Sequence, residues 1–241
     1  MILYIGTSGF SYTEWKGSFY PQDLPSREML HYYGGQFNSV EINNTFHRMP
    51  KDSMLAGWRD EVPETFRFVL KAPQRITHVN RLRDVADQVS YLFDVAGVLG
   101  RRLGAVLFQL PPSLKKDLPL LHDLLALIPP GRRVALQFRH RSWLDDEVFA
   151  LLHRNDAALC IADIEEELEI PAVATATWGY LRLRRPEYQV EELRKWAELV
   201  RGRGWSEAFV FFKHEDEAKG PLFARRFVEL ISGERDNGRG L

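Results

Sequence analysis

Short runs of apolar, β-branched and aromatic residues alternate along the chain with longer segments whose apolar residues recur at helical spacing. This alternation is typical of a parallel sheet with crossover helices. Eight βα units in 241 residues favour a closed (β/α)8 barrel of the TIM-barrel type over an open doubly wound sheet, which usually has fewer strands. The predicted strands are Ile2–Ile5, Ser39–Asn43, Arg67–Lys71, Ala105–Leu110, Arg133–Arg139, Ala158–Asp163, Tyr180–Arg184 and Ala208–Phe212.

Six segments between these strands predict helices with Gly, Pro or Asn near their ends: Ser26–Gly34, Asp84–Gly97, Leu118–Leu127, Asp145–Arg154, Val190–Arg201 and Leu222–Ile231. The sixth unit is thin, since Ile164–Thr177 holds an acidic run and Pro171, so its helix is expected to be short or missing. No repeat, flexible linker or break in composition divides the chain. We therefore expect one domain over residues 1–241, with a frayed C-terminal tail from about residue 233.

The alternation within the strands predicts which side chains enter the barrel. Apolar residues of one parity, such as Val40, Ile42 and Leu181, are expected to face the helices. Polar residues of the other parity then point inward, mostly from the C-terminal strand ends where barrel active sites lie. Facing the helices instead would bury several charges there at high cost. The inward polar residues are Glu41, Asn43, Lys71, Gln109, Gln137, Arg139, Arg182 and Arg184.

A set of motifs in chain order resembles the YecE-like family, a domain of unknown function (number 72 of its series). The motifs are Ile5–Tyr12, Trp15–Pro21, Val40–Phe46, Ile76–His78, Leu107–Pro112, Phe138–Trp143 and the strand end Ala162–Asp163. They cover most of the chain with little insertion. The resemblance implies a TIM-barrel-like fold, but it implies no particular reaction.

The chain departs from the pattern of this family at three strand ends. Gln137 stands where members tend to carry Glu, and Arg182–Arg185 reads Arg-Leu-Arg-Arg where they often read Arg-Leu-His-Gly. After the eighth strand, Lys213–Asp216 replaces a common Asn-Asn-Asp ending. Two of these changes add positive charge, so chemistry that needs the family's carboxylate or His is not expected here.

Composition restricts the classes of partner and compartment. The 32 Lys and Arg residues nearly balance the 33 Asp and Glu residues, giving a net charge of -1, unlike a strongly basic nucleic-acid binder. A single cysteine, Cys160, excludes an internal disulfide framework and is expected to pack in a strand. No apolar run is long enough to span a membrane and no basic leader is present, so the expected location is the cytoplasm, without membrane contact.

The predicted mouth of the barrel carries more positive than negative side chains. Its acidic residues are Glu41 and Asp163, whereas Lys71, Arg139, Arg182, Arg184 and Lys213 are basic, with His78, His140 and His214 nearby. Such an excess favours a small anionic ligand, phosphorylated or sugar-containing. An alternative is that Glu41 forms a buried ion pair with Arg139 or Arg182. Further candidate ligand contacts are Ser8, Tyr12, Trp15, Asn43, Gln109 and Gln137.

The first βα loop is long and aromatic, with Phe10, Tyr12, Trp15, Phe19 and Tyr20 within eleven residues. These rings would either close over the mouth and stack on a ligand or form a folded plug on the barrel rim. The sequence leaves both interpretations open.

If the protein is an enzyme, we expect a hydrolase or isomerase without a cofactor. Glu41 or Asp163 would then act as acid or base, while Lys71 and Arg139 would stabilise developing negative charge. The amine of Lys71, beside inward Glu41, is also a candidate for Schiff-base formation. No His-x-His or His-Glu-x-x-His spacing occurs and nearby cations would repel a divalent ion, so no metal is expected.

Two other classes of function stay open. By analogy with barrels that read a phosphate backbone, the chain would be a nucleic-acid-binding or nuclease-like protein. It would alternatively be a non-catalytic binding protein if every inward charge were paired. The expected oligomeric state is a monomer or weak dimer.

Overall fold

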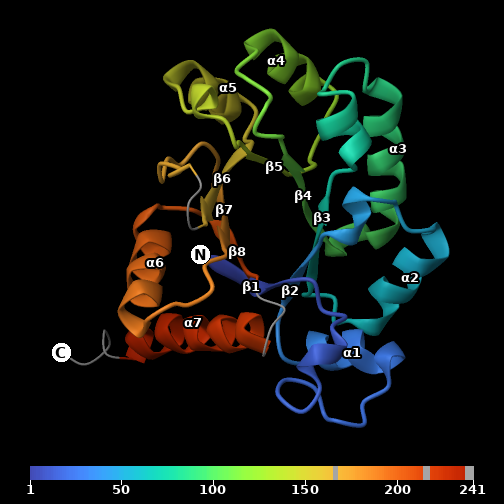
Figure 1. Cartoon of the computed structure of the whole chain (residues 1–241), viewed down its shortest axis with the longest axis vertical. Helices are drawn as coiled ribbons and strands as arrows, with labels where there is room; N and C mark the ends of the chain where they lie inside the picture. The colour runs from blue at the N-terminus through green and yellow to red at the C-terminus, as the bar shows by residue number, and fades with distance from the viewer. Residues whose placement is uncertain (165–167, 214–217, 237–241) are drawn as a thin grey trace.

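Eight parallel strands form a closed barrel at the centre of the molecule (Figure 1). The computed structural model describes residues 1–164, 168–213 and 218–236. The barrel closes where the first strand pairs with the last, in a register that runs from Ile2 opposite Glu207 to Thr7 opposite Phe212. The predicted α/β barrel fold is thus confirmed. The strands are β1 (Ile2–Ser8), β2 (Ser39–Ile42), β3 (Arg67–Lys71), β4 (Leu103–Gln109), β5 (Val134–Gln137), β6 (Ala158–Asp163), β7 (Trp178–Leu183) and β8 (Glu207–Phe212).

Helices surround the barrel and cover the outer faces of the strands (Figure 1). Over the described residues, no helix combines the length and the apolar character needed to cross a bilayer. Short helical turns lie in the loops at the C-terminal strand ends, among them η3 (Asn44–Phe46), η4 (Arg75–Val79) and η6 (Arg141–Trp143). The α-helices are α1 (Met29–Gly34), α2 (Asp52–Glu61), α3 (Ala86–Ala96), α4 (Leu118–Ala126), α5 (Asp146–Arg154), α6 (Val190–Gly202) and α7 (Lys219–Asp236).

Two helical segments differ from the sequence-based expectation. Helix α2 was not among the predicted helices, because its sequence gives a weak helical pattern. The helix contains Gly57, and Leu55 is its only fully buried residue, so its apolar stripe is short. Helix α7 spans Lys219–Asp236 and is longer at both ends than the predicted Leu222–Ile231; the fraying expected from about residue 233 stays a prediction, and residues 237–241 lie outside the described part. In the sixth unit, residue 164 and residues 168–177 contain no helix, as predicted.

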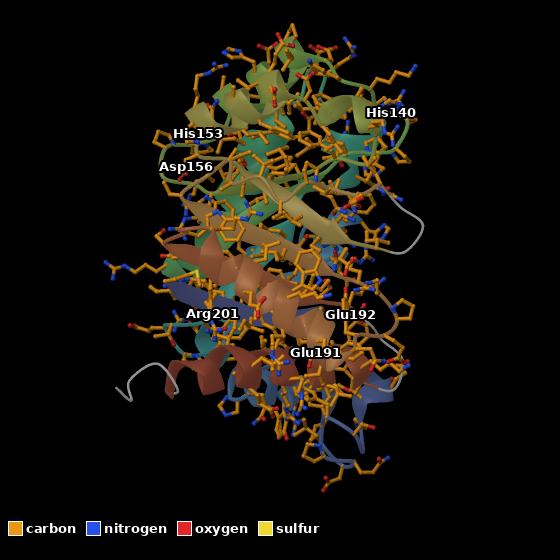
Figure 2. The ribbon with its side chains drawn as sticks, turned by 90° about the vertical axis from the view of Figure 1, so that its left-hand side faces the viewer. His140, His153, Asp156, Glu191, Glu192 and Arg201 are labelled. Atoms are coloured by element: carbon orange, nitrogen blue, oxygen red, sulfur yellow. The ribbon has the colours of Figure 1, made fainter. Side chains whose placement is uncertain are left out.

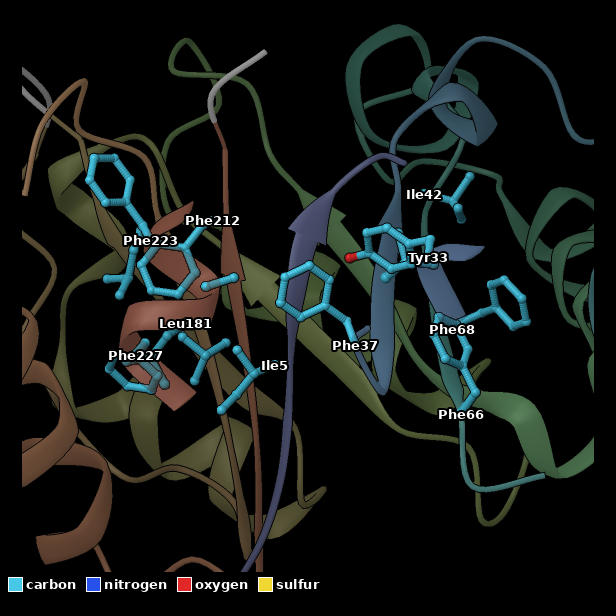
Figure 3. Close-up of a cluster of buried hydrophobic side chains, with 14 of the residues drawn as sticks. Ile5, Tyr33, Phe37, Ile42, Phe66, Phe68, Leu181, Phe212, Phe223 and Phe227 are labelled. Atoms are coloured by element: carbon cyan, nitrogen blue, oxygen red, sulfur yellow. The ribbon is translucent and has the colours of Figure 1, made fainter. Parts of the chain in front are cut away.

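The apolar residues of one strand parity pack against the helices, as the alternation predicts (Figure 3). Figure 3 shows Ile42 and Phe68 on the side of the barrel that carries Tyr33 of α1, and Phe212 near Phe223 and Phe227 of α7. This outer layer fixes the strands relative to the helices. It therefore also fixes the direction of the opposite parity, which enters the barrel.

The interior of the barrel is filled by side chains and forms a solid core. Its lower layers are apolar, and Tyr4 stacks on Phe209 with ring centroids 4.7 Å apart. Burial raises the pKa of the Cys160 thiol, which lies in this core as a packing residue. The members of this inner cluster include Tyr4, Val69, Leu107, Cys160, Trp178, Tyr180, Phe209 and Phe211.

The aromatic loop after β1 is a folded plug. Trp15 is 1% exposed and packs edge-to-face on Phe19, which stacks on Phe37. The Tyr20 hydroxyl donates to the Phe10 carbonyl and ties the loop to itself. The expected contact of Trp15 with a ligand is therefore not supported, because its ring is sealed among other aromatic rings.

The side view in Figure 2 distinguishes the two ends of the barrel. His140, which follows β5, and Glu192, in the first turn of α6 after β7, lie toward one side of the molecule (Figure 2). Asp156, which precedes β6, lies toward the other side (Figure 2). The first side is the C-terminal end of the strands, which carries the polar residues discussed below.

We expect opposite effects from adding one methyl group at two glycines. A Cβ at Gly6 in β1 would lie 1.8 Å from the Ser39 carbonyl oxygen of β2, whereas a Cβ at Gly57 in α2 would meet no atom within 4 Å. G6A should lower the free energy of unfolding by roughly 1–3 kcal/mol or more through overpacking. G57A should raise it by about 1 kcal/mol through helix propensity. Urea denaturation measures both, and equal effects would contradict the close approach of the strands at Gly6.

Candidate functional site

A buried ion pair joins opposite arcs of the barrel above its apolar core. Nη2 of Arg182 in β7 donates to Oε1 of Glu41 in β2 over 2.8 Å. The Glu41 side chain is 0% exposed and that of Arg182 is 1% exposed. Of the two partners considered for Glu41, the structure therefore selects Arg182.

The Glu41 carboxylate accepts three further hydrogen bonds. Its Oε1 accepts from Oγ of Ser8 over 2.7 Å and from Nδ2 of Asn43 over 3.1 Å, and its Oε2 accepts from the Tyr180 hydroxyl over 2.5 Å. Burial alone would raise the pKa of Glu41, but Arg182 and the donors Tyr180 and Ser8 outweigh it and hold the pKa below its usual value. A sealed carboxylate with four donors favours a structural role over the predicted role as acid or base.

Two glutamines extend this network across the barrel. Oε1 of Gln137 in β5 accepts from Nη1 of Arg182 over 2.6 Å and from Nε2 of Gln109 in β4 over 2.9 Å. Both glutamines are buried, so Gln137 holds the Arg182 guanidinium inside the barrel and neither glutamine lines an open surface. The predicted ligand contacts of Gln109 and Gln137 are thus replaced by contacts within the protein.

Lys71 ends β3 at the rim of the barrel and is half-buried. Its ammonium nitrogen lies 4.1 Å from the centroid of the Phe46 ring, in a cation–π contact. Burial lowers the pKa of Lys71 to about 8, and the positive charges of Arg182, Arg184 and Arg139 act in the same direction, while Glu41 opposes them. Lys71 therefore holds its proton less firmly than an ordinary lysine.

His78 lies beside this lysine on the π-helical turn η4 of the loop after β3. Its ring meets the Phe46 ring edge-to-face at 4.9 Å, and its Nδ1 is 2.9 Å from Oγ1 of Thr77. Burial lowers the pKa of His78, and the charges of Lys71 and Arg139 lower it further. The imidazole is therefore neutral at pH values where an exposed histidine begins to protonate.

Arg139 and Arg184 lie at the same rim and are half-buried, two residues beyond the end of β5 and one residue beyond the end of β7, respectively. Their electrostatic effect on Lys71 brings residues from three strands into one positive region. Lys213, which follows β8, is also half-buried, whereas His214 lies outside the described residues. We call Lys71, Arg139 and Arg184 the rim cations.

Asp163 turns away from the Glu41 network. Its Oδ2 accepts from Nε of Arg185 over 2.8 Å and from the Tyr188 hydroxyl over 2.9 Å. Arg185 also donates to Glu192 of α6. Asp163 shares its strand parity with Ile161, which packs against the helices. Its contacts thus anchor the loop between β7 and α6, and they do not pair it with Glu41 as a second catalytic carboxylate.

The other two candidate contacts serve local structure. Nδ1 of His140 lies 2.8 Å from Oγ of Ser142 and accepts from the Ser142 amide, which caps η6. The Tyr12 hydroxyl donates to the Ser8 carbonyl over 2.8 Å. Within the described residues, no three His, Cys, Asp or Glu side chains gather as ligands for a metal ion.

A separate cavity of about 1550 Å³ lies between α2 and α3. Its lining includes Thr45 of η3, Trp58 of α2 and Tyr91 of α3, but none of the three rim cations. This cavity lies on the outer side of the barrel and is separate from the rim cations.

Tyr180 and Phe46 are the residues of the site that the sequence analysis did not single out. Tyr180 has the parity of Arg182 on β7, so the alternation that identified Arg182 also identifies Tyr180 as inward. Phe46 belongs to a family-like motif, but nothing in its spacing indicates a contact with Lys71.

We expect Glu41→Ala to lower the free energy of unfolding by about 3–5 kcal/mol, because it leaves the Arg182 charge buried without its partner. Glu191 provides a matched control, since it pairs with Arg194 at the surface with 72% of its side chain exposed. Glu191→Ala should cost less than about 1 kcal/mol. Chemical denaturation compares the two, and similar losses would contradict the buried pair.

The same pair predicts a dependence of stability on acid pH. Since the folded-state pKa of Glu41 lies below its usual value of 4.5, its ionised form adds stability above that pH. The contribution is lost as the pH falls from there through the folded-state pKa. The stability difference between wild type and Glu41→Gln should therefore shrink in acid. A difference that grows on acidification would show that the pKa is raised instead.

Comparison with known proteins places the chain in a family. The family model described as "Protein of unknown function DUF72" matches residues 4–239. The UPF0759 protein YecE of Escherichia coli K12 is 29% identical over 140 residues, which are 58% of this chain and 49% of that protein, so the match spans about half of the relative's length. The UPF0759 protein YunF of Bacillus subtilis is 26% identical over 234 residues, which cover 90% of this chain and 80% of YunF.

Solved structures agree with this assignment. A DUF72 family protein from Thermotoga maritima superposes with a TM-score of 0.85 at 26% identity, covering 96% of this chain and 99% of that one. A D-psicose 3-epimerase from Clostridium cellulolyticum, at 10% identity and a TM-score of 0.59, covers 98% of this chain and 99% of its own, and shares the fold alone. Because the family model matches nearly the whole chain, the chain belongs to the DUF72 family of proteins of unknown function.

Proposed function

We propose that the protein binds a small anionic ligand, phosphorylated or carboxylate-bearing, at the rim formed by the C-terminal ends of β3, β5 and β7. The rim cations would contact the anion. Barrels of this type commonly carry their sites on this face.

The observation that carries the proposal is the convergence of half-buried cations from three strand ends at one rim, where they act on the same lysine and histidine. Arg139 and Arg184 both lower the pKa of Lys71, and Arg139 and Lys71 both lower the pKa of His78. Such effects require like charges that lie close together in a partly desolvated place. An anion bound there would relieve the repulsion, whereas a divalent cation would increase it.

The ion pairs of two neighbouring arginines contrast with the surroundings of Lys71. Arg182 is held by Glu41 and Arg185 by Asp163 and Glu192. The Lys71 ammonium, in contrast, forms no hydrogen bond or ion pair with any residue of the described ranges, and its close contact is with the Phe46 ring. A ligand oxyanion would complete the coordination of this ammonium.

Sulfate provides the test, because it keeps its charge over the pH range of interest. We expect sulfate and a phosphorylated sugar to raise the melting temperature, and the unphosphorylated sugar to have little effect. Arg139→Met should weaken sulfate binding by about tenfold or more through loss of a charged hydrogen bond. The matched control is Arg194→Met on α6, which should bind as wild type does. Binding should also weaken as the pH rises through about 8, where Lys71 loses its proton.

Two results would contradict the proposal. One is a melting temperature that no sulfate concentration raises. The other is a rise with a short DNA duplex that sulfate neither reproduces nor competes with, which would favour nucleic-acid binding instead.

A further inference from the structure

We propose that the amine of Lys71 forms a Schiff base with a small anionic aldehyde or ketone held by the rim cations. This inference rests on the proposed anion site and names the reactive group within it. The sequence alone makes Lys71 a candidate for this chemistry by its inward position beside Glu41, and the structure adds the surroundings that the chemistry requires.

The first requirement is a nucleophile that is both reachable and partly neutral. Lys71 is half-buried at the rim, and one face of its ammonium is covered by the Phe46 ring. Burial and the nearby cations disfavour the charged form, which is the usual way of activating a lysine for attack on a carbonyl group. With a pKa of about 8, an appreciable fraction of the side chain carries the free electron pair near neutral pH.

The second requirement is a group that moves protons beside the amine. His78 contacts the same Phe46 ring as Lys71, and its positive neighbours keep the imidazole neutral and able to accept a proton. The turn η4 that carries it is π-helical, and the loop continues through positive φ angles at Arg81, Leu82 and Asp84. Backbone of this kind costs free energy and is concentrated at functional sites.

The third requirement is a means of orienting the carbonyl compound. Arg139 and Arg184 follow β5 and β7 at the same rim as Lys71 and are close enough to lower its pKa, so an oxyanion that they bind would place the rest of a short ligand near the amine. A bidentate guanidinium contact fixes the orientation of a carboxylate or phosphate. A carbonyl group one or two bonds from that anion would then lie within reach of the lysine nitrogen.

The reaction balances without an oxidant or reductant. The nitrogen lone pair attacks the carbonyl carbon, forming the C–N bond, and the carbonyl π electrons move to oxygen, which takes up one proton from solvent. His78 would accept the excess proton from nitrogen and return it to the hydroxyl of this adduct. The nitrogen lone pair then expels that hydroxyl as water, leaving a protonated imine on Lys71.

Reductive trapping tests the inference on the whole chain. The protein is incubated separately with pyruvate, glyoxylate and dihydroxyacetone phosphate in the presence of cyanoborohydride, and adducts are located by peptide mass spectrometry. At a pH near 8, where a large fraction of the Lys71 amine is neutral, Lys71 should react roughly tenfold or more faster than Lys51, an exposed lysine outside the rim. Excess sulfate should slow the reaction at Lys71 only. Acetone, which has no charge, should show no preference for Lys71.

Two variants separate the roles of the residues. Lys71→Arg keeps the positive charge but removes the nucleophilic amine, so it should lose the adduct; the effect of sulfate on the melting temperature is measured on the wild-type chain. His78→Gln should slow adduct formation by about tenfold to a hundredfold and alter its pH profile, with Lys71 still the modified residue. Unchanged kinetics in His78→Gln would overturn the part assigned to that residue.

The outcomes distinguish this inference from the anion site on which it rests. If sulfate raises the melting temperature but none of the three compounds modifies Lys71 ahead of Lys51, the Schiff base is wrong and the anion site stands. If sulfate has no effect either, the anion site fails as well. Preferential, sulfate-sensitive modification of Lys71 supports both.

Discussion

The ion pair between Glu41 and Arg182 is the constraint on which the mouth of the barrel depends. Removing two charges from water is costly, and their attraction compensates only when other hydrogen bonds complete the geometry. Here Ser8 and Tyr180 serve the carboxylate, and Gln137 serves the guanidinium. Five strands are thereby joined by side chains above the apolar interior, since Gln109 of β4 extends the network. The pair thus forms a buried polar layer beneath the rim, and a ligand at the rim would lie on the solvent side of it.

The burial of the charged and polar side chains inside the barrel depends on their position along the barrel axis. Arg184 follows Arg182 of β7 by two residues and therefore has the same parity. Arg182 is fully buried, whereas Arg184 is half-buried. The same relation holds between Gln137 and Arg139 beside β5. Polar groups of one parity thus form two levels. The lower level holds the barrel together, and the upper level meets solvent.

The sequence was informative where one periodicity decides the outcome. Alternation along β2, β3 and β7 identified Glu41, Lys71 and Arg182 as inward, because the opposite parity is uniformly apolar. It could not choose between Arg139 and Arg182 as the partner of Glu41, which depends on strand heights around a closed barrel. Helix α2 escaped detection because a glycine and one buried leucine give too little pattern. Asp163 shows a different limit, since the alternation was not applied to β6, where it places this residue on the helix side.

The closure of the barrel has a consequence for the order of folding. β1 pairs with β2 on one edge and with β8 on the other, and α7 packs against it. During synthesis, the β1 edge that pairs with β8 therefore stays exposed until nearly the whole chain has been made. The carboxylate of Glu41 must likewise wait for a guanidinium 141 positions later. Contacts so distant in sequence carry a large loop-closure cost and slow the final step. The last stage of assembly therefore seals the edge and neutralises the buried charge together, which discourages partly closed forms from persisting.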